Sequence, residues 1–254
     1  MKLRLLLVLF ALVSVIRLHA SEPAPAVPQP VLVSVHGAWA GGWQVKKVAT
    51  LLEAKGWKVY RPSLSGLGEH FNTARTDIGL ATHIDDIVNF ILFEDLHDVI
   101  LLGHSYGGMV ITGVADRIPE RIGRLIYLDA FLPENGESVM TVRKTGALQI
   151  ESMVRDGFII PSWVKPEKPF PKDVPHPLKT FTDAIVLKHQ VAAARIPATY
   201  ILTVDPGRKP EDDDYYPSAA RAKARGWPVV IMEADHVPQW RKPEATAELL
   251  LGLR

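Results

Sequence analysis

Short apolar runs and stretches with helical spacing alternate along most of the chain. The runs predict strands at residues 31–35, 58–64, 98–102, 125–128, 199–204 and 229–232. Helical spacing of apolar residues predicts helices at 45–55, 81–96, 108–115 and 245–253. Strands that alternate with helices are typical of a mostly parallel sheet with helices on both faces. The predicted fold class is therefore α/β.

Residues 132–196 break this alternation. No clean strand is evident there, and seven of the chain's 20 prolines lie between Pro133 and Pro177. Proline interrupts helices, so we expect short helices and irregular links rather than one long helix. The interval is also rich in large apolar side chains and follows a predicted strand. It is predicted to form a cap over the edge of the sheet where the strands end.

The first 30 residues have the pattern of a targeting segment and a linker. Residues 1–20 combine a basic start with an apolar stretch at 5–16, shorter than the roughly 20 residues that a membrane-spanning helix needs. A secretory signal peptide is predicted, with an uncleaved membrane anchor as the alternative. Residues 21–30 contain four prolines and predict an extended linker. The mature domain then spans 31–254, in the periplasm or outside the cell, with no stable membrane insertion.

Composition narrows the possible chemistry. The net charge is +1 and no basic block occurs, so no nucleic-acid partner is expected. The chain has no cysteine, which excludes disulfides, thiolate metal sites and a cysteine nucleophile. Its nine histidines are scattered without a metal-binding motif. Neither a metal nor an organic cofactor is predicted.

The segment Gly103-His104-Ser105-Tyr106-Gly107 directly follows a predicted buried strand and precedes a predicted helix. In this context the pattern G-x-S-x-G indicates a nucleophile elbow, a sharp turn that exposes a serine hydroxyl at the carboxyl edge of the sheet. The two glycines leave room for the turn, where a Cβ would clash. Ser105 is therefore the predicted nucleophile of a serine hydrolase.

A serine hydroxyl needs a base within hydrogen-bond reach. His236 is the predicted base, because it follows the strand at 229–232 and precedes the last helix. His104 adjoins the nucleophile, but neighbours on so tight a turn diverge. His36 ends the first strand and is expected to brace the loop that follows.

The base in turn needs an acid between Ser105 and His236 in the chain. Asp205 directly follows the strand at 199–204 and is the predicted acid, with Asp129, after the strand at 125–128, as the second candidate. The acidic patch at 212–214 is a third possibility, although its expected role is to cap a helix that begins nearby.

Two backbone N–H groups are expected to bind the oxyanion. One belongs to Tyr106, the residue after the nucleophile, at the start of the following helix. The other is assigned to Ala38, in the loop after the first strand, where Gly37 lets the backbone turn.

Five segments in combination resemble one group of the α/β-hydrolase fold superfamily. They are residues 36–43 (HGAWAGGW), 65–69 (SGLGE), 103–108 (GHSYGG), 127–133 (YLDAFLP) and 234–238 (ADHVP). The chain is similar from about residue 31 to its C-terminus to bacterial EstC-type esterases, pyrethroid hydrolases, plant methyl esterases and hydroxynitrile lyases. The resemblance implies Ser105, Asp205 and His236 as the triad and Ala38 and Tyr106 as the oxyanion donors.

Two positions separate esterase from lyase within this group. The lyases typically have threonine where this chain has Gly37, and lysine directly after the catalytic histidine, where this chain has Val237. The acid loop, residues 204–208 (VDPGR), also departs from the pattern of the group, which keeps Asp129 open. The expected function is a serine carboxylesterase acting on small, fairly apolar esters. The alternatives are a slow or non-catalytic binding protein of the same fold and a hydroxynitrile lyase.

Overall fold

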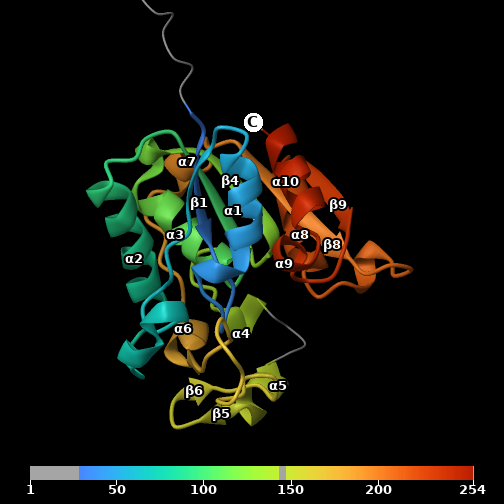
Figure 1. Cartoon of the computed structure of the whole chain (residues 1–254). Helices are drawn as coiled ribbons and strands as arrows, with labels where there is room; N and C mark the ends of the chain where they lie inside the picture. The colour runs from blue at the N-terminus through green and yellow to red at the C-terminus, as the bar shows by residue number, and fades with distance from the viewer. Residues whose placement is uncertain (1–28, 143–146, 254) are drawn as a thin grey trace, which may run out of the picture.

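The computed structural model describes residues 29–142 and 147–253, so the predicted signal peptide and most of the predicted linker lie outside the described residues. Its centre is a six-stranded parallel sheet in the order β2-β1-β3-β4-β8-β9 (Figure 1). The strands are β1 (Val31–Val35), β2 (Lys58–Tyr60), β3 (Val99–Ser105), β4 (Ile122–Ala130), β8 (Ala198–Val204) and β9 (Val229–Glu233).

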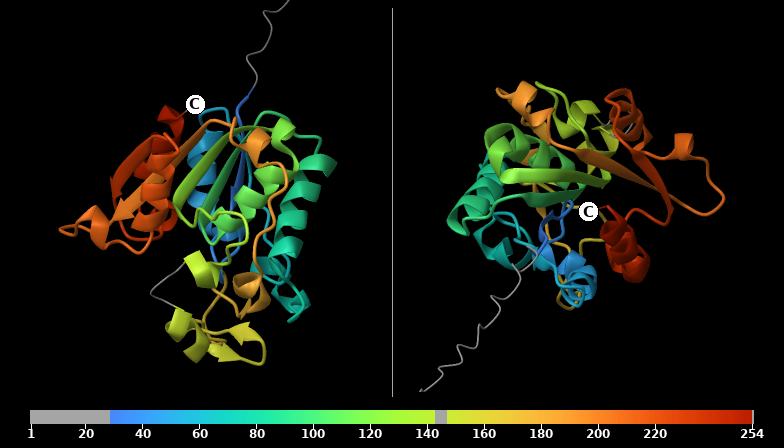
Figure 2. Two further views of the ribbon diagram at one scale, coloured as in Figure 1. Left: turned by 180° about the vertical axis from the view of Figure 1, so that it is seen from behind. Right: turned by 90° about the horizontal axis from the view of Figure 1, so that it is seen from above.

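Helices cover both faces of this sheet (Figure 2). On one face α1 (Lys46–Glu53) packs against α10 (Pro243–Gly252). The other face is covered by α2 (Leu80–Phe93), α3 (Gly107–Arg117) and α8 (Tyr216–Ala224). Short elements connect these parts: η1 (Gly42–Val45), η2 (Gly68–Thr73), η3 (Pro119–Arg121), η4 (Pro210–Asp212) and α9 (Pro238–Arg241). The predicted α/β class with a mostly parallel sheet is confirmed.

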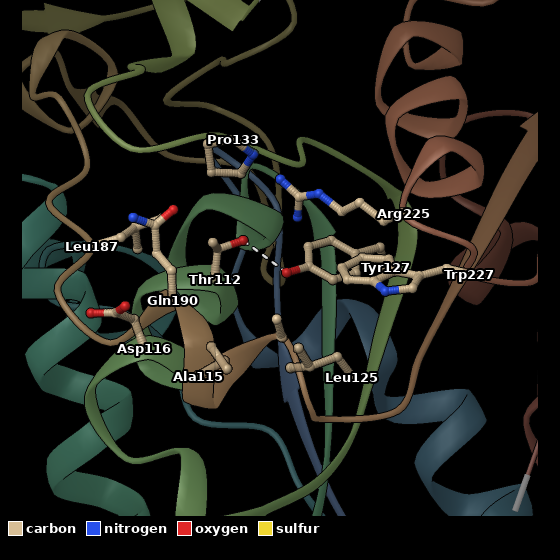
Figure 3. A pocket seen from close by; sticks show the side chains of 12 residues that line it. Thr112, Ala115, Asp116, Leu125, Tyr127, Pro133, Leu187, Gln190, Arg225 and Trp227 are labelled. Carbon is tan, nitrogen blue, oxygen red and sulfur yellow. Dashed lines mark hydrogen bonds between the residues drawn. The ribbon is translucent and has the colours of Figure 1, made fainter.

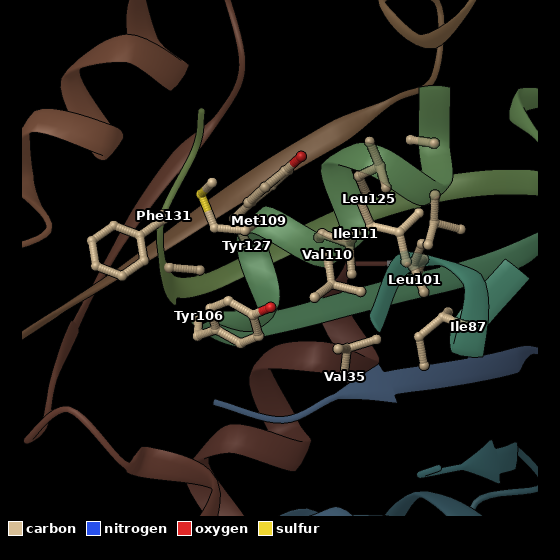
Figure 4. Packing of buried hydrophobic residues seen from close by; sticks show 14 of the residues in the cluster. Val35, Ile87, Leu101, Tyr106, Met109, Val110, Ile111, Leu125, Tyr127 and Phe131 are labelled. Carbon is tan, nitrogen blue, oxygen red and sulfur yellow. The ribbon is translucent and has the colours of Figure 1, made fainter. Parts of the chain in front are cut away.

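Both faces of the central strands are buried, which explains their continuous apolar sequences. Successive strand residues point to opposite faces. In β4, Leu125 and Tyr127 join the core beneath α2 and α3, whereas Ile126 and Leu128 join the core beneath α1 and α10. Figure 4 shows the first of these cores, with Met109 of α3 beside the strand residues. A strand buried on both sides has no polar face, so the apolar runs located the sheet.

The boundaries of several strands differ from the predicted ones. β2 ends at Tyr60 rather than at residue 64, because Pro62 has no N–H to continue the ladder. β3 and β4 are longer than predicted and carry polar residues at their carboxyl ends, among them Ser105 and Asp129. These polar residues at the ends of β3 and β4 belong to the candidate active site described below.

Residues 132–196 are called the cap segment here. In its described part, 132–142 and 147–196, the elements up to residue 182 lie beyond the carboxyl ends of the central strands, whereas residues 190–193 lie back near the amino end of β4, beside the end of α3 (Figure 1). The cap segment contains the short helices α4 (Val139–Val142), α5 (Ala147–Ser152), α6 (Lys179–Thr182) and α7 (Gln190–Ala193). It also contains three two-residue strands, β5 (Val154–Arg155), β6 (Phe158–Ile159) and β7 (His176–Pro177), which form a small antiparallel sheet. The expected short helices are present. The three strands were not evident in the sequence, because two residues are too few to show an alternating pattern.

The order in which strands are added to the sheet reverses at β1: the chain places β2 on one side of β1 and then crosses back to place β3 on the other. β1 pairs with β2 on one side and with β3 on the other, so the loops after β1 and β3 leave the sheet side by side. Such a switch point opens a crevice at the carboxyl ends of the strands. Within 29–142 and 147–253, no helix combines the length and apolar character needed to cross a membrane.

Candidate active site

Ser105 occupies a strained turn at the end of β3. Its φ is +54°, in the left-handed region that L residues rarely adopt. A Cβ on Gly103 would lie 2.7 Å from the carbonyl oxygen of Gly107, and a Cβ on Gly107 would lie 2.5 Å from that of Val35. Both distances are too short for real contacts. The two glycines of the motif therefore allow the turn that presents the Ser105 hydroxyl.

The structure brings His236 to Ser105. The His236 Nε2 lies 3.0 Å from the Ser105 Oγ, although 131 residues separate them in the chain. The loop that carries His236 is held in place from below, because His104 Nε2 donates a hydrogen bond of 2.6 Å to the His236 carbonyl oxygen. His104 thus positions the loop of His236, and the ring beside the Ser105 hydroxyl is that of His236. The catalytic roles of Ser105 as nucleophile and His236 as base stay predictions.

Asp129 lies on the far side of the His236 ring. Its Oδ2 accepts a hydrogen bond of 2.6 Å from His236 Nδ1, and its Oδ1 accepts one of 3.0 Å from the backbone N–H of Thr203. Only 1% of Asp129 is exposed. A buried carboxylate with two donors holds the imidazole in one orientation and in the Nδ1–H tautomer.

The prediction of Asp205 as the acid is corrected by this arrangement. The Asp205 side chain is half exposed and pairs with the guanidinium of Arg208 at 3.9 Å, in a turn after β8. The physical reason is the order of the strands. β4 is the direct neighbour of β3, and Ser105 pairs in register with Ala130, next to Asp129. Asp205 follows β8, which is one strand further from the nucleophile.

Tyr215 is a site residue that the sequence did not indicate. Its Oη lies 2.9 Å from the Ser105 Oγ, and its ring stacks on the His236 ring with centroids 4.7 Å apart and planes 10° apart. Its backbone N–H donates to Asp213 Oδ1 at 2.8 Å, just before α8, which is the helix-start role expected for the acidic patch. Tyr215 and Tyr216 are adjacent in a charged stretch, and no sequence pattern distinguishes them.

The loop after β1 lies against the nucleophile elbow. A Cβ on Gly37 would lie 3.1 Å from the Cβ of Ser105 and 3.0 Å from His104 Nδ1, so Ala38 follows directly on this contact. Tyr106 buries its side chain in the core, where its hydroxyl meets His83 at 3.0 Å, so it faces the site only with its backbone. Both residues lie where oxyanion donors are expected, and that role stays a prediction.

Four histidines are buried around this loop. Burial lowers the pKa of His36 and of His83 to about 4, and lowers the pKa of His104 and His176 well below the usual range. His36 accepts the Leu64 N–H at Nε2 and donates from Nδ1 to the Gly37 carbonyl oxygen, so it braces the loop as expected. In the described part of the chain, no cluster of three histidines or acidic residues could hold a metal ion.

The cap segment is attached to the same loop through Trp39. The Trp39 N–H donates to His176 Nδ1 at 3.2 Å, its indole N–H donates to the Ile159 carbonyl oxygen at 3.0 Å, and its carbonyl oxygen accepts the Val174 N–H at 2.8 Å. Trp39 also has a positive φ of 63°. Three hydrogen bonds to the cap segment therefore hold a residue next to Ala38 in a strained conformation.

Replacement of His176 by phenylalanine should destabilise the protein by about 1–3 kcal/mol, because the Trp39 N–H loses its acceptor while the ring volume is kept. Urea unfolding of wild type and His176→Phe at pH 7 measures this difference. His70→Phe is the control, because His70 is exposed. Equal unfolding free energies for wild type and His176→Phe would show that this contact carries no stability.

One cavity of about 400 Å³ lies away from Ser105, between the second half of α3, the first half of β4 and α7 (Figure 3). Its wall includes Thr112 and Tyr127, whose hydroxyls are 2.8 Å apart, and Arg225 lies at its rim beside Trp227. None of Ser105, His236 or Asp129 lines it. This cavity is therefore separate from the candidate active site around Ser105.

A model of the alpha/beta hydrolase family matches residues 32–249. The chain belongs to the alpha/beta hydrolase family. This hydrolase is 51% identical over 110 residues to a carbendazim hydrolyzing esterase of Nocardioides, a match that covers 43% of this chain and 46% of that protein. The chain spans about half the length of the first curated relatives that it matches.

A longer match links this alpha/beta hydrolase to a pheophorbidase of Raphanus sativus, with 26% identity over 86% of this chain and 92% of that protein. Among solved structures, an extracellular alpha/beta-hydrolase from Paenibacillus superposes with a TM-score of 0.72 at 23% identity, covering 88% of this chain and 98% of the other. A methylesterase from Arabidopsis superposes with a TM-score of 0.68 at 23% identity, covering the same shares. These structures confirm the fold.

Proposed function

We propose that this protein is a serine carboxylesterase that hydrolyses small, fairly apolar carboxylic esters through an acyl-enzyme intermediate. One observation carries the proposal: the continuous chain of contacts from the Ser105 Oγ to His236 Nε2, and from His236 Nδ1 to Asp129 Oδ2, at 3.0 Å and 2.6 Å. A nucleophile, a base and an orienting acid in this geometry are what acyl transfer requires.

In the first half of the reaction His236 takes the proton of Ser105 while the Oγ attacks the ester carbonyl carbon. The negative charge then moves to the carbonyl oxygen, where the N–H groups of Ala38 and Tyr106 are the proposed donors. Asp129 stabilises the imidazolium of His236 through the Nδ1 hydrogen bond. The intermediate collapses when His236 gives its proton to the departing alcohol, which leaves an acyl group on Ser105.

In the second half His236 takes a proton from water, which attacks the acyl carbon. The bond to the Ser105 Oγ breaks, the Oγ recovers a proton from His236, and the carboxylic acid leaves. About 41% of the His236 side chain is exposed, so water can reach the base. The steps return every group to its starting state and need no cofactor.

The aromatic surroundings of the site support an apolar substrate. The Phe131 ring lies 4.9 Å from the Tyr215 ring beside His236, and Trp163 of the cap segment packs against Trp39 at 5.5 Å. The names of the relatives, a carbendazim hydrolyzing esterase and methylesterases, agree with small esters. The basic start and apolar stretch in residues 1–20 favour action in the periplasm or outside the cell.

Hydrolysis of p-nitrophenyl esters by the purified protein tests the proposal. We expect turnover of p-nitrophenyl acetate, release of methanol from apolar methyl esters, and only the uncatalysed background rate with Ser105→Ala. Cyanide release from mandelonitrile without ester hydrolysis would favour a lyase. Folded wild-type protein that turns over no ester of the panel would favour a binding protein of this fold.

A further inference from the structure

Tyr215 makes a contact to the reacting oxygen that the triad does not explain. Its hydroxyl lies 2.9 Å from the Ser105 Oγ, so this oxygen has two partners, His236 and Tyr215. The tyrosine comes from the turn before α8, and its ring is fixed between the Phe131 and His236 rings at centroid distances of 4.9 Å and 4.7 Å. A tyrosine hydroxyl at this distance is positioned to form a hydrogen bond with the nucleophilic oxygen during the reaction.

The direction of this hydrogen bond follows from the protons available. Asp129 offers only acceptors to His236, so His236 Nδ1 carries the hydrogen and the neutral ring leaves Nε2 as an acceptor. Ser105 has one hydroxyl hydrogen. For His236 to act as the base, this hydrogen must be donated to His236 Nε2. The Tyr215 O–H therefore donates to the Ser105 Oγ.

We propose that Tyr215 is a further catalytic residue, which stabilises the Ser105 Oγ as a leaving group when the acyl-enzyme is hydrolysed. This inference rests on the proposed esterase function. In the acyl-enzyme the Oγ is an ester oxygen, which is a weak acceptor. When the tetrahedral intermediate formed by water collapses, the C–Oγ bond breaks, its electron pair goes to the Oγ, and the proton arrives from His236. A donor at the Oγ strengthens its hydrogen bond as that charge develops.

The attack on the first ester gains less from Tyr215. Ser105 already accepts the Tyr215 hydrogen bond in the free enzyme, and the Oγ becomes a weaker acceptor as it bonds to the carbonyl carbon. An interaction that is no stronger in the transition state than in the ground state does not accelerate that step. Loss of the hydroxyl should therefore slow deacylation and leave acylation almost unchanged.

A carbamate ester separates the two steps, because the carbamoyl-enzyme is long-lived. The protein is treated with p-nitrophenyl dimethylcarbamate, and release of p-nitrophenolate gives the rate of carbamoylation. After removal of excess reagent, the return of esterase activity gives the rate of decarbamoylation. Tyr215→Phe keeps the ring on His236 and removes only the hydroxyl. Tyr216→Phe is the matched control, because no hydrogen bond joins Tyr216 to Ser105.

We expect Tyr215→Phe to recover about tenfold more slowly than wild type, the effect of one hydrogen bond to a developing charge, and to carbamoylate within about threefold of the wild-type rate. Tyr216→Phe should match wild type in both steps. Equal slowing of both steps would mean that Tyr215 only positions other groups. An unchanged recovery rate would mean that its hydroxyl does not assist deacylation. Either result would overturn the inference. A wild-type protein that takes up no carbamoyl group on Ser105 would instead contradict the proposed function.

Discussion

Replacement of Asp129 by asparagine should lower kcat/KM for p-nitrophenyl acetate by about 10⁴-fold, because the amide no longer selects the Nδ1–H tautomer of His236 or stabilises its protonated form. The change keeps the size of the side chain. Its Oδ1 can still accept the Thr203 N–H, so the turn after β4 should persist. Steady-state kinetics of wild type and Asp129→Asn measure the effect.

Asp205→Asn is the matched control, since both carboxylates lie at the carboxyl ends of parallel strands of the same sheet, Asp129 within β4 and Asp205 directly after β8. The Asp205 side chain is half exposed and pairs with Arg208 at the surface, so its loss should change kcat/KM by less than about threefold. The reverse result, with activity lost in Asp205→Asn and kept in Asp129→Asn, would assign the acid to β8. Circular dichroism and thermal unfolding of both variants establish that each is folded.

The second large effect is a loss of stability in acid. Burial holds the pKa of His36 and of His83 at about 4, whereas an unfolded histidine titrates near 6.5. Between these values the unfolded chain binds protons that the folded protein does not, so the free energy of unfolding rises with pH and falls as the pH is lowered. For these two histidines together we expect a loss of about 2 kcal/mol between pH 6 and pH 5.

Urea unfolding at pH 7, 6 and 5 measures this dependence. His83→Gln keeps a donor for the Ser65 carbonyl oxygen and an acceptor for the Tyr106 hydroxyl, and removes one of the buried groups that titrate. It should reduce the loss between pH 6 and pH 5 by about 1 kcal/mol, the contribution of one of the four buried histidines whose pKa is lowered. His97→Gln is the control, because His97 is exposed. A free energy of unfolding that stays constant from pH 7 to pH 5, or equal slopes for His83→Gln and wild type, would contradict this origin.

The sequence located the sheet and the nucleophile because each has a local signal. A strand buried on both faces is a continuous apolar run, and the glycines around Ser105 mark a turn that only small residues permit. His236 could be placed because few histidines follow a strand near the end of the chain. The short strands of the cap segment had no such pattern, since each has only two residues.

The acid could not be chosen from the chain alone. Asp129 and Asp205 both follow a predicted strand and both fall between Ser105 and His236, so the order of the triad fits either. What decides is that β4 lies directly beside β3, a fact of strand order that no local pattern reports. Tyr215 was missed for a related reason. Its contact with Ser105 joins residues 110 positions apart, and the neighbouring Tyr216 has the same side chain.

Covalent labelling by a fluorophosphonate probe tests the reactivity of Ser105 most directly. The probe is added to folded protein, and the modified residue is found by peptide mass spectrometry. We predict one adduct per chain on Ser105, formed rapidly by wild type and by Asp205→Asn and much more slowly by Asp129→Asn. An active protein that carries the label on another residue, or takes up none, would contradict the assignment of Ser105 as a nucleophile activated by His236 and Asp129.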